Sequence, residues 1–203
     1  MIHESAPWKA ELLKDADMIE RWAQKQSASE RRSFLIEKKV FISAYAMRRL
    51  FEGEKLTSGL NSLSIAAKEF VPLPGRELTW WKTHSFEKVF DLSTPVRHSV
   101  GASDLLNVII HSKLFAECIY DMNDLRCIGF FVTSEKRNDH LWLVPISSYT
   151  KLIREVGSDY PSSARIVFDA ETGKHFSWRG HGEPPTDVAR KMNRIVGDSN
   201  KVE

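Results

Sequence analysis

The chain has few cysteines, and their number and spacing argue against two common kinds of site. Only Cys118 and Cys127 occur among its 203 residues. Two cysteines are too few for the disulfide framework on which small secreted domains depend. They lie nine positions apart with no second pair, which is not the ligand spacing of a zinc site. We therefore expect reduced core thiols and no bound metal.

Long apolar runs are also missing. No uninterrupted stretch approaches the roughly 20 residues that a membrane-spanning helix needs. The first residues, Met1 to Pro7, lack the basic segment and apolar run of a secretory signal peptide. These absences predict a cytoplasmic protein that does not enter a membrane.

Neither sign of charge dominates, since 29 Lys and Arg residues face 27 Asp and Glu residues and the formal net charge is +2. Nucleic-acid-binding domains usually carry a basic excess, so a nucleic-acid partner is possible but gains no support from the net charge. The motifs G-x-x-x-x-G-K-[ST], G-x-G-x-x-G, H-E-x-x-H and G-x-S-x-G are missing too. The sequence therefore predicts no cofactor.

What is present is an ordinary globular composition, with 42% apolar residues, which suits a single domain with its own core. A first helix is predicted over about residues 7–26, with Ser5 as its cap and Pro7 in its first turn. Apolar residues at steps of three and four form one stripe along it: Leu12, Ala16, Ile19 and Trp22 or Ala23.

A second helix, antiparallel to the first, is predicted to begin near Ser27, because Ser27 and Glu30 fit a capping box. Gly53 stands where a left-handed residue would end it. Its buried face would hold Ile36, Val40, Met47, Leu50 and Phe51. Its basic residues indicate either a solvated face or a phosphate-binding stripe: Arg31, Arg32, Lys38, Lys39, Arg48 and Arg49.

The pattern weakens between Thr57 and Pro95. Residues 62–71 fit either a helix or a strand, and residues 78–82 have the composition of a strand. The latter contain Trp80 and Trp81 beside basic residues, a mixture that stacks bases in single-strand binders. Adjacent strand residues face opposite sides, so one of the two tryptophans is expected in the core.

A short helix that is apolar nearly all round follows, capped by Ser103 or Asp104, and should be buried. Strands 114–120 and 125–134 then form a hairpin. A turn at Asn123-Asp124 would place Asp121 opposite Arg126 and Ile119 opposite Ile128. A turn at Met122-Asn123 would instead place Cys118 opposite Cys127, which would permit a disulfide or a shared ligand site.

A third strand at 140–146, a short helix closed by Gly157, and a second hairpin come next. In that hairpin 165–169 pairs with 174–178, so that Asp169 meets Lys174 and Gly173 takes the left-handed turn position. A last helix spans about 186–196, after Pro184-Pro185.

This order predicts an α+β fold: an N-terminal helical pair packed on an antiparallel sheet of about five strands, with short inserted and C-terminal helices. One domain would comprise a helical part (1–56), a mixed segment ending in the buried helix (57–112), the sheet (113–180) and a C-terminal helix and tail (181–203).

Two polar groups stand out as a candidate site. Asn107 and His111 are four apart and share a helix face, with Ser112 after them. The second group, in the loop after the second hairpin strand, is Ser134, Arg137 and Asn138.

These residues have either a structural or a catalytic role. They could tie the helix end to backbone groups and shape the loop. Otherwise His111, Asn107 and Arg137 are the catalytic residues, and the binding residues are Ser112, Ser134, Asn138, Trp80 and Trp81.

Three stretches, 41–50, 106–112 and 129–138, resemble a family of uncharacterised bacterial proteins of about 200 residues. Because the function of that family is unknown, the resemblance implies no catalytic residues. The segment 106–111 is also similar to the Arg-Asn-x-x-x-His helix motif of HEPN ribonucleases, which are all-helical. That resemblance implies an RNA-cleaving role for His111, but Leu106 stands at the Arg position and the predicted strands disagree with an all-helical fold.

Two functional hypotheses follow. The first is a non-catalytic binding or accessory protein of a bacterial cell, with a protein partner or a second copy bound through the N-terminal helices at Phe34, Phe41 and Tyr45. The second is a metal-independent hydrolase acting on RNA. It would use His111 as general acid or base, because histidine titrates near neutrality, and Arg137 would supply the charge that Leu106 cannot.

Overall fold

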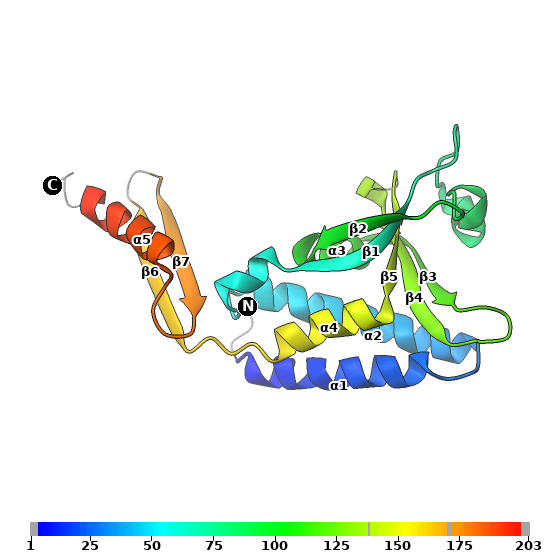
Figure 1. Cartoon of the computed structure of the whole chain (residues 1–203), viewed down its shortest axis with the longest axis horizontal. Coiled ribbons are helices and arrows are strands. Elements are labelled where there is room, and N and C mark those ends of the chain that lie inside the picture. The colour runs from blue at the N-terminus through cyan, green and yellow to red at the C-terminus, as the bar shows by residue number, and fades with distance from the viewer. Residues whose placement is uncertain (1–3, 138, 170–171, 200–203) are drawn as a thin grey trace.

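The computed structural model describes residues 4–137, 139–169 and 172–199, and it has helices and strands in separate layers (Figure 1). The α-helices of the described part are α1 (Ala6–Ala23), α2 (Glu30–Glu52), α3 (Ala102–Ile110), α4 (Ile146–Gly157) and α5 (Thr186–Ser199). Short 3-10 helices occur at η1 (Ser58–Ser62), η2 (Trp80–Lys88) and η3 (Glu135–Arg137).

Five strands form one antiparallel sheet in the order β2-β1-β5-β4-β3. They are β1 (Ser64–Phe70), β2 (Val96–Gly101), β3 (Ser112–Ile119), β4 (Cys127–Ser134) and β5 (Leu141–Pro145). This arrangement confirms the α+β class, with the N-terminal helices and α4 lying along one side of the sheet (Figure 1).

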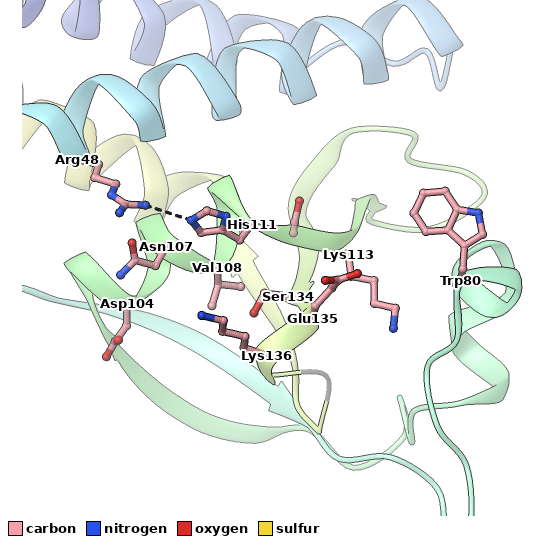
Figure 2. A pocket seen from close by; sticks show the side chains of 11 residues that line it. Arg48, Trp80, Asp104, Asn107, Val108, His111, Lys113, Ser134, Glu135 and Lys136 are labelled. Carbon is pink, nitrogen blue, oxygen red and sulfur yellow. Dashed lines mark hydrogen bonds between the residues drawn. The ribbon is translucent and has the colours of Figure 1, made fainter.

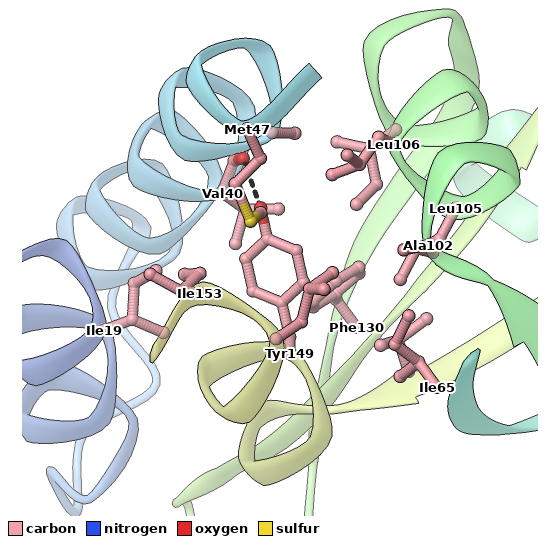
Figure 3. Close-up of a cluster of buried hydrophobic side chains, with 14 of the residues drawn as sticks. Ile19, Val40, Met47, Ile65, Ala102, Leu105, Leu106, Phe130, Tyr149 and Ile153 are labelled. Carbon is pink, nitrogen blue, oxygen red and sulfur yellow. Dashed lines mark hydrogen bonds between the residues drawn. The ribbon is translucent and has the colours of Figure 1, made fainter. Parts of the chain in front are cut away.

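The main core lies between the helices and one face of the sheet. Phe130 of β4 is fully buried there, with its ring 5.0 Å from that of Phe115 and 5.4 Å from that of Tyr149. The Tyr149 hydroxyl, at the centre of Figure 3, donates to the carbonyl of Val40 at 2.8 Å. Its oxygen also lies 2.9 Å from the Ser43 hydroxyl, so α4 is tied to α2 inside the core. Burial raises the pKa of Tyr149, so this phenol stays a hydrogen-bond donor.

The opposite face of the sheet is covered by residues 71–95, which we call the η2 arm. Leu78, Val89 and Phe90 of the arm are buried against Phe70 and Leu141 of the sheet. The arm therefore has an apolar anchor of its own, which holds η2 against the sheet.

A separate C-terminal lobe contains β6 (Ser163–Asp169), β7 (Lys174–Gly180) and α5, and it projects from the end of the helical layer (Figure 1). Val167 and Trp178 of this hairpin pack against Met192 of α5. Because the apolar face of both strands packs against α5, they form a two-stranded sheet and do not extend the larger one. The predicted range of the sheet, 113–180, was therefore wrong at both ends. β1 and β2 of the five-stranded sheet precede residue 113, whereas β6 and β7 fall within the range but form a sheet of their own.

Several helix ends differ from the sequence prediction. Ser5 precedes α1 as expected, but its side chain makes no capping hydrogen bond. Ser29, and not Ser27, caps α2, and its hydroxyl accepts from the Arg32 amide at 3.2 Å. Gly53 has φ −81°, and the left-handed residue is Glu54 (φ 53°), whose carboxylate pairs with Arg179 of β7. Neither Ser103 nor Asp104 caps α3, because the chain enters that helix from β2 at Gly101.

The strand predicted at 78–82 was wrong, and so was the expectation that one tryptophan there is buried. Trp80 and Trp81 begin η2 and are both exposed. The segment has no partner strand, and its apolar anchors do not alternate as strand residues would. Residues 62–71, which fitted a helix or a strand, form β1. The edge strand β2 was missed because it buries little more than Val100 and so lacks alternation.

The first hairpin follows the predicted register along most of its length and departs from it near the turn. Cys118 pairs with Gly129, in line with a turn at Asn123-Asp124. A bulge then shifts the pairing, so that Ile119 faces Cys127 and not Ile128. The alternative Cys118–Cys127 pairing does not occur, and both thiols are free. In the second hairpin, Asp169 faces Lys174 and Gly173 has φ 65°, as predicted.

Candidate functional site

A surface cleft lined mainly by polar and charged side chains lies at the end of α3, and we call it the α3 cleft (Figure 2). It has a volume of about 640 Å³, within the range of roughly 300–1,000 Å³ typical of small-molecule sites. Its walls come from five segments: α2, α3, the start of β3, the end of β4 with η3, and η2.

His111 ends α3 and is exposed to the cleft. Its Nε2 lies 3.3 Å from Nη1 of Arg48, which α2 presents from the neighbouring wall (Figure 2). A guanidinium can only donate, so this contact is a hydrogen bond only where Nε2 is the ring nitrogen that accepts. The geometry places an imidazole nitrogen of His111 beside the cation of Arg48.

Arg48 is positioned by its own helix. Its Nε donates to Oε1 of Glu52 at 2.8 Å, an i, i+4 pair that leaves Nη1 directed at His111. The hydrogen bond from Arg48 lowers the pKa of the Glu52 carboxyl. Arg49 makes the corresponding contact with the other oxygen of Glu52, also at 2.8 Å, but does not line the cleft.

The floor of the cleft is formed where β3 begins and β4 ends. Ser112 pairs with Ser134 across these strands, and Ser134 is buried while Ser112 is half-buried. A register shift between Ser112 and Leu114 marks Lys113 as the irregular residue, and Lys113 lines the cleft. Bulges of this kind re-aim a side chain, which accounts for the position of the lysine.

The cleft carries charges of both signs, with an excess of cations. Arg48, Lys113 and Lys136 line it together with two carboxylates, Asp104 and Glu135. This composition favours an anionic ligand that also contains hydrogen-bond donors for the carboxylates.

One exposed tryptophan, Trp80, lines the cleft, and the next residue, Trp81, is exposed but lies outside the lining. Trp80 lines the cleft from η2, on the opposite side from Arg48, as Figure 2 shows. Its side chain is 70% exposed, and that of Trp81 is 87% exposed. Large apolar side chains this open to solvent are characteristic of interaction surfaces.

The structure brings together most of the residues predicted from the sequence. Asn107, His111, Ser112, Ser134 and Trp80 all line the α3 cleft. The helix that carries Asn107 was expected to be buried, but Asn107 and His111 are both exposed. Arg137 ends η3, but its side chain lies outside the described residues, as does Asn138.

Sequence reasoning missed Arg48, Lys113 and Lys136 as members of this site. Arg48 was seen only as one of six basic residues on the second helix, and nothing local connects it with His111, 63 positions later. The only indication in the sequence was that Arg48 lies close to the C-terminal end of the second predicted helix.

The six basic residues of α2 do not form one phosphate-binding stripe. Arg32 is buried and pairs with Glu117 of β3, its Nε 3.0 Å from Oε1. Lys39 pairs with Asp15 of α1 at 2.5 Å, and Arg49 pairs with Glu52. Of the six, Arg48 alone lines the α3 cleft.

A second exposed surface lies on the N-terminal helices. Phe34 and Tyr45 are exposed as expected, whereas Phe41 is half-buried with its ring 5.5 Å from that of Phe115. An apolar groove of about 340 Å³ between α1 and α2 is lined by Trp8 and Ile42, among others. A protein partner or a second copy on this surface stays a prediction.

The two thiols lie away from the α3 cleft. Burial raises the pKa of the Cys127 thiol to about 12 and also raises that of Cys118. In the described part of the chain, no group of three or more His, Cys, Asp or Glu side chains could hold a metal ion. Over the same residues, no helix is both long and apolar enough to span a bilayer.

Comparisons of the chain with protein-family models, with curated proteins and with solved structures give no match. The fold and the site therefore define a class only, an α+β protein with a cleft at the end of α3 that three basic and two acidic side chains line. The similarities to uncharacterised bacterial proteins and to the HEPN motif stay expectations.

Proposed function

We propose that this chain is a non-catalytic binding protein whose α3 cleft holds a phosphate-bearing ligand. The observation that carries the proposal is the convergence of Arg48, His111, Lys113 and Lys136 from α2, α3, β3 and η3 on one cleft. Charge-assisted hydrogen bonds from guanidinium and ammonium groups are the strongest that a side chain offers to a phosphate oxygen.

Arg48 is the residue on which such binding depends most. Its Nη1 is directed into the cleft at 3.3 Å from His111, where it can meet a phosphate oxygen without breaking the bond from Nε to Glu52. Lys113 and Lys136 would hold further phosphate oxygens. The hydroxyl of Ser112 and the amide of Asn107 add neutral donors at the floor and wall.

Arg48→Ala should weaken the binding of inorganic pyrophosphate roughly 10- to 100-fold, the value of one hydrogen bond to a charged group. Isothermal titration calorimetry measures this without a label. Arg49→Ala is the matched control, because Arg49 also pairs with Glu52 at 2.8 Å and is equally exposed but lies outside the cleft. Equal affinities for the two variants, or no heat with the wild type, would contradict the proposal.

A metal-independent hydrolase acting on RNA is the second candidate, and the Arg48–His111 contact favours it. Once Arg48 turns from Nε2 of His111 to the phosphate, that nitrogen would accept the proton of the attacking 2′-hydroxyl. The 2′-oxygen bonds to phosphorus, the bond to the 5′-oxygen breaks, and the departing 5′-oxygen takes a proton from water. Arg48 would stabilise the charge on the phosphoryl oxygens, the role first assigned to Arg137. Leu106, at the Arg position of the HEPN motif, is buried and cannot serve.

His111→Ala should abolish cleavage of a labelled single-stranded RNA if the hydrolase is real, and cleavage by the wild type should persist in EDTA. His84→Ala is the control, since His84 is exposed on η2 and does not line the cleft. Product bands on a denaturing gel give the rate. An RNA left intact by the wild type, or cut equally fast by His111→Ala, rules this candidate out.

We propose the cytoplasm of a bacterial cell as the location. Cys118 and Cys127 are free thiols, and Cys118 is only half-buried. Free thiols of this kind suit a reducing compartment. The bacterial source rests on the resemblance to bacterial proteins alone.

A further inference from the structure

We infer that the phosphate-bearing ligand of the α3 cleft is a single-stranded nucleic acid, which runs from Arg48 and His111 to the η2 arm and stacks its bases on Trp80 and Trp81. This inference rests on the proposed function and names the class of its ligand. It is carried by an observation that the cations do not explain, namely two consecutive tryptophans that the fold leaves uncovered.

These two tryptophans do not hold the η2 arm in place. The η2 arm is anchored by Leu78, Phe86, Val89 and Phe90, which pack against the sheet. Trp80 and Trp81 take no part in that cluster and stay 70% and 87% exposed. An indole has a large flat face whose removal from water is favourable, so a flat partner is expected to cover it.

The chemistry beside the tryptophans identifies that partner. Base–aromatic stacking next to a cationic groove is how proteins bind single strands without reading their sequence. In a duplex the bases are stacked on one another and cannot reach an indole face. A peptide would use the aromatic faces but would leave Arg48, Lys113 and Lys136 without phosphates.

The placement of the groups sets the length of the ligand. Arg48 and Trp80 lie at opposite sides of the cleft (Figure 2), and Trp81 lies outside its lining. One nucleotide can occupy the cationic side or the Trp80 side, whereas contact with Trp81 as well requires further nucleotides. We therefore expect affinity to rise with oligonucleotide length.

Fluorescence anisotropy with labelled oligouridylates of about 4 to 16 nucleotides, the usual site sizes of single-strand grooves, tests this inference. Trp81→Ala should weaken binding of the longer oligonucleotides roughly 5- to 100-fold, the value of one stacked base, and Trp80→Ala should do so as well. Trp8→Ala is the control, an exposed tryptophan on α1 that is distant in sequence from the arm and outside the cleft. With three cationic contacts, log K should fall with log salt at a slope of about −2.

Unchanged affinity in both Trp80→Ala and Trp81→Ala, tighter binding of a duplex than of the single strand, or equal competition by uridine monophosphate would each overturn the inference. So would capture of a proline-rich peptide in place of the oligonucleotide. The proposed function is tested separately. It is contradicted if the wild type does not bind pyrophosphate, or if Arg48→Ala binds it as tightly as Arg49→Ala does. Circular dichroism of each variant shows that it is folded, which these exposed positions should allow.

Discussion

Arg32→Ala is expected to lower the free energy of unfolding by about 3–5 kcal/mol, the cost of breaking a buried ion pair. The Arg32 side chain is 3% exposed, and Nη1 donates to the carbonyls of Lys25 at 2.8 Å and Leu125 at 2.6 Å. Its Nε lies 3.0 Å from Glu117, whose other oxygen accepts from Ser33 at 2.6 Å. Removing the guanidinium leaves a buried carboxylate without its cation and two carbonyls without a donor.

Urea denaturation provides the measurement, with Arg31→Ala as the control because Arg31 is the exposed neighbour on the same helix. The control should change stability by no more than about 0.5 kcal/mol. The pair Arg32→Met with Glu117→Leu should recover only part of the loss, because it removes the unpaired carboxylate but leaves the carbonyls of Lys25 and Leu125 without a donor. An Arg32→Ala protein as stable as the Arg31→Ala protein would contradict the burial of this pair.

Phe130→Ala is the second large effect, with an expected loss of about 3–5 kcal/mol. Phe130 is fully buried at the contact between the sheet and the helices, against Phe115 and Tyr149. The cavity left by the ring is enclosed by β3 and α4, so the surroundings can close it only in part.

Phe34→Ala provides the comparison, because Phe34 is 58% exposed on α2. It should lie within about 0.5 kcal/mol of the wild type in the same urea titration. If the two phenylalanine variants were equally stable, the layer arrangement of Figure 3 would be wrong.

The parts of the fold that the sequence predicted well carry a strong local pattern. The α1 stripe of Leu12, Ala16 and Ile19 indicates directly which side is buried, whereas β4, which is buried on both faces, was found from its run of apolar residues after a turn. β2 could not be found in this way, because an edge strand with both faces largely open has no alternation to read. The sequence also did not indicate that the second hairpin packs against α5 and stays outside the main sheet, because this depends on long-range packing.

The candidate site divides in the same way. Asn107 and His111 are four apart on one helix, so their common face followed from helical geometry. Whether Ser134 joins them could not be predicted, and it is the pairing of Ser112 with Ser134 that brings it to the same cleft. Arg48 joins them only through the packing of α2 against α3, for which no local pattern in the sequence exists. The tryptophans were assigned to a strand because aromatic composition favours strands, yet here the apolar anchors around them decide the local conformation.

The most direct test of the α3 cleft as the ligand site is an NMR titration of the wild-type protein with a single-stranded oligonucleotide. We expect the indole signals of Trp80 and Trp81 to shift on binding, together with the amides of residues 107–113 and 134–136. Shifts confined to the N-terminal helices around Trp8 and Ile42, with the cleft signals unmoved at saturation, would contradict this expectation.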